Sequence, residues 1–173
     1  MKNRIIIFPG KMSDVFFLNE IDYIREFFDS IYVFTYKGDI QQYNRIAKEK
    51  NIEYEVIKDI SWNSIFQIVK EFFRGKNKEI FYELHKVLKK EGNIKTKIKR
   101  IGYLLYYINY AFNVEKAYRK INSDNYNAIL YSFWLSRGAY ACAYLKDKYR
   151  IKKCIARAHG FDLYDERNSI NYI

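Results

Sequence analysis

The chain opens with an apolar run, Arg-Ile-Ile-Ile-Phe at residues 4–8, which is closed by Pro9 and Gly10. Apolar residues at consecutive positions indicate a strand with both faces buried, as in parallel sheets that helices cover on both sides. Proline and glycine are typical of the turn that ends such a strand. A strand of this kind cannot stand alone, so the rest of the chain must supply its neighbours and its covering helices.

Four further runs rich in β-branched and aromatic residues follow, at residues 31–35, 52–57, 128–132 and 153–157. Segments with helical spacing separate them, and this alternation is the pattern of a parallel sheet with right-handed crossovers. The run at 52–57 alternates polar and apolar residues more clearly, so we expect it towards an edge of the sheet. The sequence therefore predicts an α/β fold, a Rossmann-like sheet of five parallel strands with flanking helices.

The spacing of apolar residues also predicts helices, with Ser13 or Asp14 capping the first and Ser136 capping the last. The predicted helical ranges are 15–28, 40–50, 61–74, 78–90, 94–121 and 137–149. Those between the third and fourth strands form a helical insert at about 62–121. The longest has an apolar stripe of Ile94, Ile98, Ile101, Leu105, Ile108 and Phe112. Close packing of the last helix on the sheet is expected at Ala139, Ala141 and Ala143.

The length of 173 residues and a hydrophobic fraction of 49% suit a single globular domain. The two cysteines, Cys142 and Cys154, form neither a CxxC pair nor a metal-binding spacing, and we interpret them as small buried residues. Pro9-Gly10-Lys11 lacks the spacing of a P-loop, and no GxGxxG follows the first strand. We therefore expect no metal and no cofactor.

The first apolar run is too short for a signal peptide, and no stretch approaches the roughly 20 apolar residues that span a bilayer. We therefore expect a cytoplasmic, soluble protein, peripheral at most to a membrane. The net charge of +11, from 31 basic and 20 acidic residues, favours acidic partners.

Much of this charge gathers between Lys86 and Arg100, where Glu91 is the one acidic residue. The cluster includes Lys95, Lys97, Lys99 and Arg100, and four tyrosines follow on the same predicted helix: Tyr103, Tyr106, Tyr107 and Tyr110. A basic flank beside aromatic residues suits an anionic membrane or a phosphorylated lipid. The same cluster suits a nucleic acid backbone, and it also suits a helix face that is simply solvated.

Ligands of an open parallel sheet bind at the carboxyl ends of its strands. Three predicted loops meet there, at residues 9–14, 132–137 and 159–167. We expect one cleft at this edge, bordered by Gly10, Lys11, Trp134, Arg137, His159, Gly160 and Asp162.

His159 is the candidate catalytic residue, since it stands where the last strand becomes a loop and its imidazole can donate or accept a hydrogen bond. Gly160 after it permits positive φ and close approach of the backbone. The alternative is a structural histidine bonded to its own turn. Asp162, Asp165 and Glu166 could act as acid–base groups, but we favour ion pairs with Arg157 and Arg167 that pin the loop.

The stretch at residues 157–168, Arg-Ala-His-Gly-Phe-Asp-Leu-Tyr-Asp-Glu-Arg-Asn, resembles a segment of bacterial family-4 glycosyltransferases, which have the GT-B fold. Tyr-Ser-Phe-Trp-Leu at 131–135 resembles the segment just before it in that family, and residues 17–21 are similar to the start of the family's first helix. The three similarities occur in the order of the family.

The resemblance implies the N-terminal, acceptor-binding half of a retaining GT-B enzyme, a class that usually works without a metal. The nucleotide-sugar donor would bind mainly to a second Rossmann-like domain, and His159 would approach the donor sugar from the N-terminal side. The loop at 9–14 would lie near the acceptor and the donor phosphates. The basic insert would suit a saccharide acceptor on a lipid carrier, for surface polysaccharide synthesis at the inner membrane face.

The donor domain of that family is absent from these 173 residues, and so are the last strands of its acceptor domain. We therefore expect a fragment that cannot transfer sugar alone. One alternative function is a basic module that binds anionic membrane or nucleic acid without catalysis, although nucleic acid is not the partner we expect. Another is a stand-alone enzyme using His159 and Asp162, which ranks last because the sequence shows no recognisable pair of a nucleophile and a general base.

Overall fold

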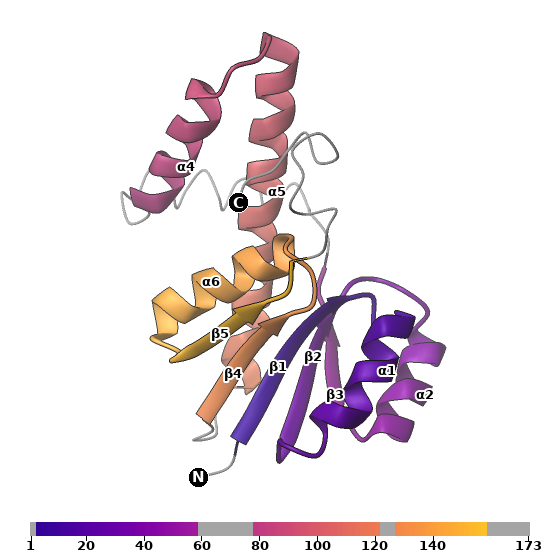
Figure 1. The fold of residues 1–173 in the computed structure, drawn as a ribbon. Helices are drawn as coiled ribbons and strands as arrows, with labels where there is room; N and C mark the ends of the chain where they lie inside the picture. The colour runs from indigo at the N-terminus through magenta and orange to yellow at the C-terminus, as the bar shows by residue number, and fades with distance from the viewer. Residues whose placement is uncertain (1–2, 59–77, 122–126, 159–173) are drawn as a thin grey trace.

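The computed structural model describes residues 3–58, 78–121 and 127–158. Its centre is a five-stranded parallel sheet with the strand order β3-β2-β1-β4-β5 (Figure 1). The strands are β1 (Asn3–Gly10), β2 (Ser30–Thr35), β3 (Glu53–Val56), β4 (Asn127–Ser132) and β5 (Lys153–Ala156). The predicted Rossmann-like parallel sheet is confirmed, and so is the edge position of the third strand. The strand order reverses beside β1, so a crevice forms between the loops that follow β1 and β4.

β1 is the central strand, and its register explains why residues 5–8 are all apolar. Ile6 pairs with Tyr32 of β2 on one side and with Leu130 of β4 on the other. The pairing with β2 shifts between Ile7 and Gly10, which marks an irregularity near Pro9. The strand thus continues to Gly10, two residues beyond its predicted end, because proline is tolerated where the regular ladder is interrupted.

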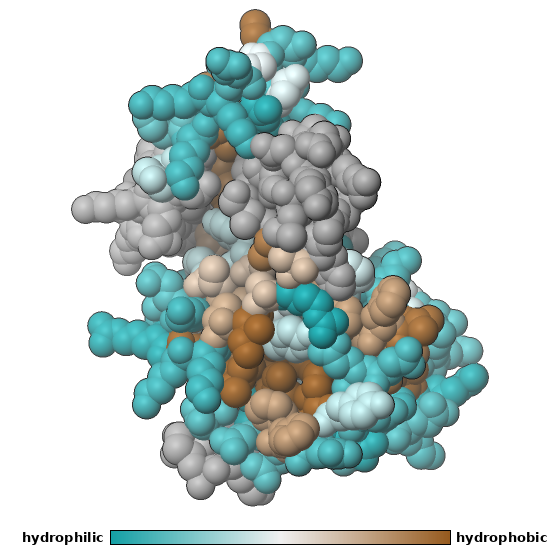
Figure 2. Space-filling view, in the orientation of Figure 1, coloured by the Kyte–Doolittle hydropathy of each residue, from teal (hydrophilic) through white to brown (hydrophobic). Residues whose placement is uncertain are grey.

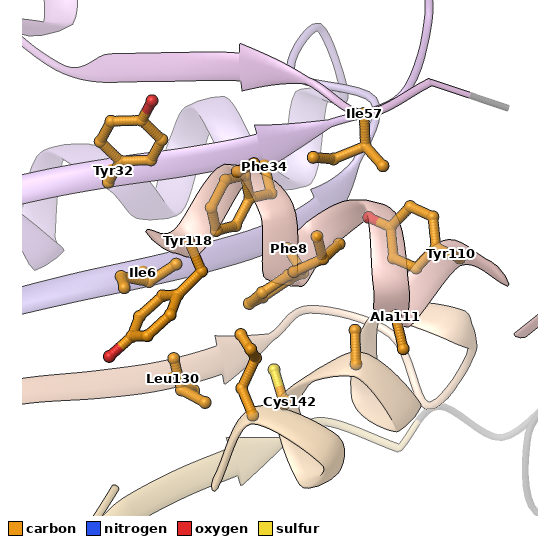
Figure 3. Packing of buried hydrophobic residues seen from close by; sticks show 14 of the residues in the cluster. Ile6, Phe8, Tyr32, Phe34, Ile57, Tyr110, Ala111, Tyr118, Leu130 and Cys142 are labelled. Carbon is orange, nitrogen blue, oxygen red and sulfur yellow. The ribbon is translucent and has the colours of Figure 1, made fainter. Parts of the chain in front are cut away.

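Helices cover both faces of the sheet. α1 (Val15–Ile24) and α2 (Ile40–Lys50) pack on one face, and α5 (Ile94–Ile121) and α6 (Arg137–Tyr149) pack on the other, while α4 (Lys78–Lys89) lies against α5 (Figure 1). Alternate residues of β1 serve the two cores, Ile5 and Ile7 facing α1 and α2, and Ile6 and Phe8 facing α5 and α6 (Figure 3). The predicted helix at 61–74 lies outside the described residues.

α1 ends earlier than predicted, at Ile24 rather than residue 28. Glu26 and Phe27 donate backbone hydrogen bonds three residues back, to Tyr23 and Ile24, at 3.3 and 3.1 Å. This tighter turn ends the α-helix, although Phe28 still packs against the core as expected. Asp14 rather than Ser13 caps the start, because its side chain accepts a hydrogen bond from the Phe16 backbone at 2.9 Å.

The predicted apolar stripe of α5 is wrong in its first part. Ile94 and Ile98 are 77% and 64% exposed, whereas Leu104 and Ile108 are buried. The cause is visible in Figure 1, where the first turns of α5 extend past the sheet and α4 is the one described element that lies beside them. Periodicity alone does not reveal where a long helix leaves the core.

α6 approaches the sheet through a different residue from the alanines expected. Ala141 is buried, but Ala139 is only partly buried and Ala143 is exposed. The helix packs tightly on the sheet at Gly138, where an added Cβ would lie 2.8 Å from the Ser132 side-chain oxygen. Ser136 occupies the N-cap position of α6, but its side chain makes no capping hydrogen bond.

The two cysteines lie side by side on α6 and β5. Cys142 is buried as predicted, whereas Cys154 is only partly buried. The hydrogen bond from Cys142 is the main cause that lowers the pKa of the Cys154 thiol to about 7.

Among the described helices, none is both long and apolar enough to cross a membrane.

Candidate functional site

A pocket of about 600 Å³ lies at the carboxyl edge of the sheet. Loops after β1, β2 and β4 form one side of it, and the middle of α5 forms the other. Its lining comprises Pro9, Gly10, Lys11, Ser13, Asp14, Tyr36, Tyr103, Tyr106, Tyr107, Trp134, Ser136 and Arg137. The structure thus brings together four residues predicted to border one cleft, Gly10, Lys11, Trp134 and Arg137. The other three, His159, Gly160 and Asp162, lie outside the described residues.

The loop after β1 is held against β2 by Thr35, whose side chain is fully buried. The Thr35 hydroxyl accepts a hydrogen bond from the Met12 backbone at 2.9 Å and donates one to the Gly10 carbonyl at 3.1 Å. Gly10 has φ +88, a conformation that favours glycine. Met12 is buried in the core beneath the loop. These contacts fix the backbone from Gly10 to Met12 and leave the Lys11 side chain exposed at the pocket.

The loop after β4 is fixed in a similar way. Phe133 donates a backbone hydrogen bond to Phe8 of β1 at 3.1 Å, and its ring is buried. The buried Ser132 hydroxyl donates to the Trp134 carbonyl at 2.7 Å, and the Ser136 amide donates to the same carbonyl at 2.9 Å. Trp134 is therefore held at the pocket edge by three neighbouring backbone and side-chain contacts.

Arg137, the first residue of α6, lies among tyrosine rings. Its guanidinium carbon is 3.3 Å from the centre of the Tyr36 ring, 4.8 Å from Tyr106 and 5.0 Å from Tyr110. A guanidinium is attracted to the faces of aromatic rings, and its planar shape stacks on them. These contacts orient a delocalised positive charge within the pocket lining.

The electrostatics of the pocket favour an anion. Lys11 and Arg137 supply two full positive charges, and α1 and α6 both begin at this edge, where a helix carries partial positive charge. The one carboxylate of the lining belongs to Asp14, and its oxygen already accepts the capping hydrogen bond of α1. Anionic ligands that also present a ring would meet aromatic faces and cations together.

Sequence reasoning missed the aromatic side of this pocket. Tyr36 follows β2, and Tyr103, Tyr106 and Tyr107 come from α5. For the basic cluster and the tyrosines that follow it, the sequence leaves open an anionic membrane, a nucleic acid backbone and a solvated helix face, and it does not indicate the pocket. Their spacing of three and four residues places them on one face of the helix, and that signal was available. The sequence alone does not show whether this face of α5 points towards the carboxyl edge of the sheet or away from it.

A second polar cluster fixes the chain just before His159. The Tyr131 hydroxyl donates to Glu20 at 2.8 Å, and Arg157 forms an ion pair with the other oxygen of Glu20 at 2.6 Å. Burial and then this hydrogen bond raise the pKa of Tyr131. The Arg157 amide also donates to the Ser132 carbonyl at 3.0 Å. The predicted ion pairs of Arg157 with Asp162, Asp165 or Glu166 involve residues outside the described ones, so they stay a prediction. Among the described residues, Arg157 pairs with Glu20 on α1.

The predicted basic patch lies apart from the pocket lining. The residues of this patch, Lys95, Lys97, Lys99 and Arg100, belong to the first two turns of α5, near the turn that joins it to α4.

Within the described part of the chain, no group of three or more His, Cys, Asp or Glu side chains is placed to hold a metal ion. The pocket therefore offers binding groups, cations and aromatic rings, and the catalytic role of His159 stays a prediction.

The comparisons with known proteins do not extend this description. The chain matches no family model, no curated protein and no solved structure.

Proposed function

We propose that this chain is the acceptor-binding, N-terminal domain of a retaining GT-B glycosyltransferase. In this proposal a sugar moves from a nucleotide-sugar donor to a saccharide acceptor that carries an anionic phosphate and a lipid. The single observation that carries it is the pocket itself, in which Lys11 and Arg137 lie among five aromatic side chains at the carboxyl edge of a parallel sheet. The resemblance of residues 157–168 to the glycosyltransferase family supports the same class.

The chemistry of the lining suits an anionic saccharide for two reasons. The C–H faces of a sugar ring carry slight positive charge and stack on the electron-rich faces of tyrosine and tryptophan. Phosphate oxygens accept charge-assisted hydrogen bonds from lysine and arginine, and these bonds are stronger than neutral ones. Here the rings come from β2, α5 and the loop after β4, so they surround the ligand position from more than one side.

Each residue has a defined role in this proposal. Lys11, which is exposed, contacts a ligand phosphate directly. Arg137 is oriented by Tyr36 and binds the same anion from the start of α6. Trp134 and the α5 tyrosines stack against the sugar. His159 would act at the donor side, as the family resemblance implies, and the donor itself would bind mainly to a second domain.

Ligand binding tests the proposal without requiring turnover. Calorimetric titration of the chain would use a disaccharide diphosphate with a short prenyl tail, the disaccharide alone, a nucleotide sugar and duplex DNA of the same charge. We expect the disaccharide diphosphate to bind more tightly than the other three. Equal binding of all anions, or tighter binding of duplex DNA, would contradict the proposal.

Substitutions at the two cations give the first specific prediction. Lys11→Ala and Arg137→Ala should each weaken binding of the disaccharide diphosphate about tenfold or more, as expected when a hydrogen bond to a charged group is lost. Arg137→Lys should recover only part of this loss, because lysine keeps the charge but cannot stack on Tyr36 in the same way.

Lys146→Ala is the matched control, since Lys146 lies on the same helix as Arg137 but is exposed in its last turn. Its affinity for the ligand should equal that of the unmodified chain. If Lys146→Ala weakened binding as much as Lys11→Ala, the effect would be one of net charge, and the pocket would not be the site.

A further inference from the structure

We propose that the outer end of the α4–α5 hairpin docks on an anionic lipid bilayer and holds the pocket close to it. We define the hairpin tip as residues 86–100, which include the end of α4, the turn at 90–93 and the start of α5. Figure 1 shows that this part of the molecule extends away from the sheet. The docking goes beyond ligand binding in the pocket. Only its purpose, which is to bring the pocket close to a lipid-linked acceptor, rests on the proposed function.

Three apolar side chains at the hairpin tip are exposed and belong to none of the core clusters formed by the described residues. Ile94 and Ile98, four residues apart and hence on one face of α5, are the most exposed isoleucines at this end, and Leu88 of α4 is 45% exposed. Hydrophilic side chains surround the hairpin in Figure 2, with a hydrophobic one at its outer end. An apolar end within a polar surround is the composition of a segment that enters the interface of a bilayer.

The charge of the hairpin tip selects the kind of bilayer. Seven basic residues and one acidic residue, Glu91, lie between Lys86 and Arg100. Lys95 and Lys99 are exposed and lie one helical turn apart, close to Ile94 and Ile98 around the helix. Lysines beside exposed isoleucines fit anionic headgroups above an apolar layer. A nucleic acid backbone would satisfy the lysines but would leave the isoleucines in water.

The tip has a defined shape rather than a loose end. The Asn93 side-chain oxygen accepts hydrogen bonds from the Thr96 amide and hydroxyl, both at 2.9 Å, and so caps α5. The Arg100 guanidinium donates to the Glu91 carbonyl at 2.7 Å and closes the turn. Ile94 is thereby fixed at the first position of the helix, where it projects at the end of the hairpin.

Helix geometry places the pocket at a useful distance from this tip. Tyr103, which lines the pocket, follows Ile94 by nine residues, and a rise of 1.5 Å per residue separates them by about 14 Å along α5. Lys95, Lys99 and Tyr103 are successive i, i+4 positions, so a basic strip leads from the tip to the pocket. A saccharide phosphate anchored in the bilayer could therefore reach the aromatic lining while its lipid stays in place.

Vesicle co-sedimentation tests the docking. The chain is mixed with vesicles of phosphatidylcholine alone, or with about 30% phosphatidylglycerol to give an anionic surface. We expect binding to the anionic vesicles at least tenfold tighter than to the neutral ones. Both Ile94→Ser/Ile98→Ser and Lys95→Gln/Lys99→Gln should lower it at least tenfold, while circular dichroism stays unchanged because these side chains are exposed.

The matched controls carry the same changes elsewhere. Phe27→Ser removes an apolar side chain that is 73% exposed after α1, and Lys48→Gln/Lys152→Gln removes two exposed lysines away from the hairpin. Both should keep anionic vesicle binding within twofold of the unmodified chain. In addition, brominated lipid should quench the extra fluorescence of Ile94→Trp, measured relative to the unmodified chain with its two tryptophans, but not the extra fluorescence of Phe27→Trp.

Several results would overturn the inference. These are no preference for anionic vesicles, vesicle binding that survives Ile94→Ser/Ile98→Ser, or binding of duplex DNA that is tighter and depends on the lysines alone. Binding of the disaccharide diphosphate in the absence of vesicles should be unaffected by the isoleucine changes. Failure at the vesicles therefore rejects the docking, and failure in the ligand titration rejects the proposed function, independently of each other.

Discussion

Replacing Glu115 with glutamine is expected to lower the free energy of unfolding by about 3 kcal/mol at pH 7, the scale for removing one partner from a buried charged network. Glu115 lies on α5 and is buried against α6. Its two carboxylate oxygens accept hydrogen bonds from the side chains of Arg119, Tyr144, Lys148 and Tyr149. Three of these donors are on α6, so the carboxylate joins the two helices that cover one face of the sheet.

The pH dependence distinguishes this network from ordinary packing. Burial acts to raise the pKa of Glu115, but hydrogen bonds from Lys148, Tyr144 and Arg119 outweigh it and lower the pKa from 4.5 to about 2. The folded state therefore holds the ionised form more strongly than the unfolded state does. The stabilisation is fully present above about pH 4.5 and is lost as the pH falls towards 2. Urea unfolding at a series of pH values should show the unmodified chain and Glu115→Gln converging in acid.

Glu55→Gln is the control for a surface ion pair. Glu55 on β3 pairs with Lys120, also on α5, at 2.8 Å, but the lysine side chain is mostly exposed. Exposed pairs contribute about 0–1 kcal/mol, so this change should have a small effect on stability. Equal effects of Glu55→Gln and Glu115→Gln, or a Glu115→Gln effect that persists at pH 2, would show that the buried carboxylate does not stabilise the fold through its charge.

Glu115 also illustrates what the sequence could predict and what it could not. The parallel sheet was predictable from the uninterrupted apolar run of β1, because a strand with both faces buried is typical of a parallel sheet that helices cover on both sides. The bounds of α5 followed from its helical spacing. The burial of Glu115 could not be predicted from the sequence, because an acidic residue in an amphipathic helix is normally expected to face water. Its four hydrogen-bond donors come together only when α6 packs on α5.

The residues of the candidate site could also be predicted only in part from the sequence. Gly10, Lys11, Trp134 and Arg137 could be grouped from the sequence because the carboxyl ends of parallel strands must share one edge. The three tyrosines of α5, Tyr103, Tyr106 and Tyr107, could not be added, because their contribution depends on the rotation of α5 about its axis. Tyr36 follows β2 directly, so the same edge argument could have included it. The ion pair of Arg157 with Glu20 was not predicted, because the two residues are far apart in the sequence and close together across the sheet.

Replacing Gly138 with leucine is expected to destabilise the fold by about 3 kcal/mol, the upper part of the usual range for overpacking. A Cβ at this position would lie 2.8 Å from the Ser132 side-chain oxygen and 3.0 Å from the Phe8 Cβ, so larger side chains must displace α6 from the sheet. Because Ser132 holds Trp134 and Arg137 precedes Gly138, the same displacement should also weaken ligand binding. Gly138→Ala should follow the same direction with a smaller loss, about 1 kcal/mol.

Gly102 provides the matched control, because it is also a helical glycine but has nothing within 4 Å of an added Cβ. Gly102→Ala should raise the free energy of unfolding by up to about 1 kcal/mol, as alanine favours a helix more than glycine does. Opposite signs for alanine at the two positions, measured by urea unfolding, would establish that contact with Ser132 and Phe8 decides the residue at 138. If Gly138→Ala were as stabilising as Gly102→Ala, α6 would not be seated on the sheet at this glycine, and the positions of Trp134 and Arg137 in the pocket would have to be set by other contacts.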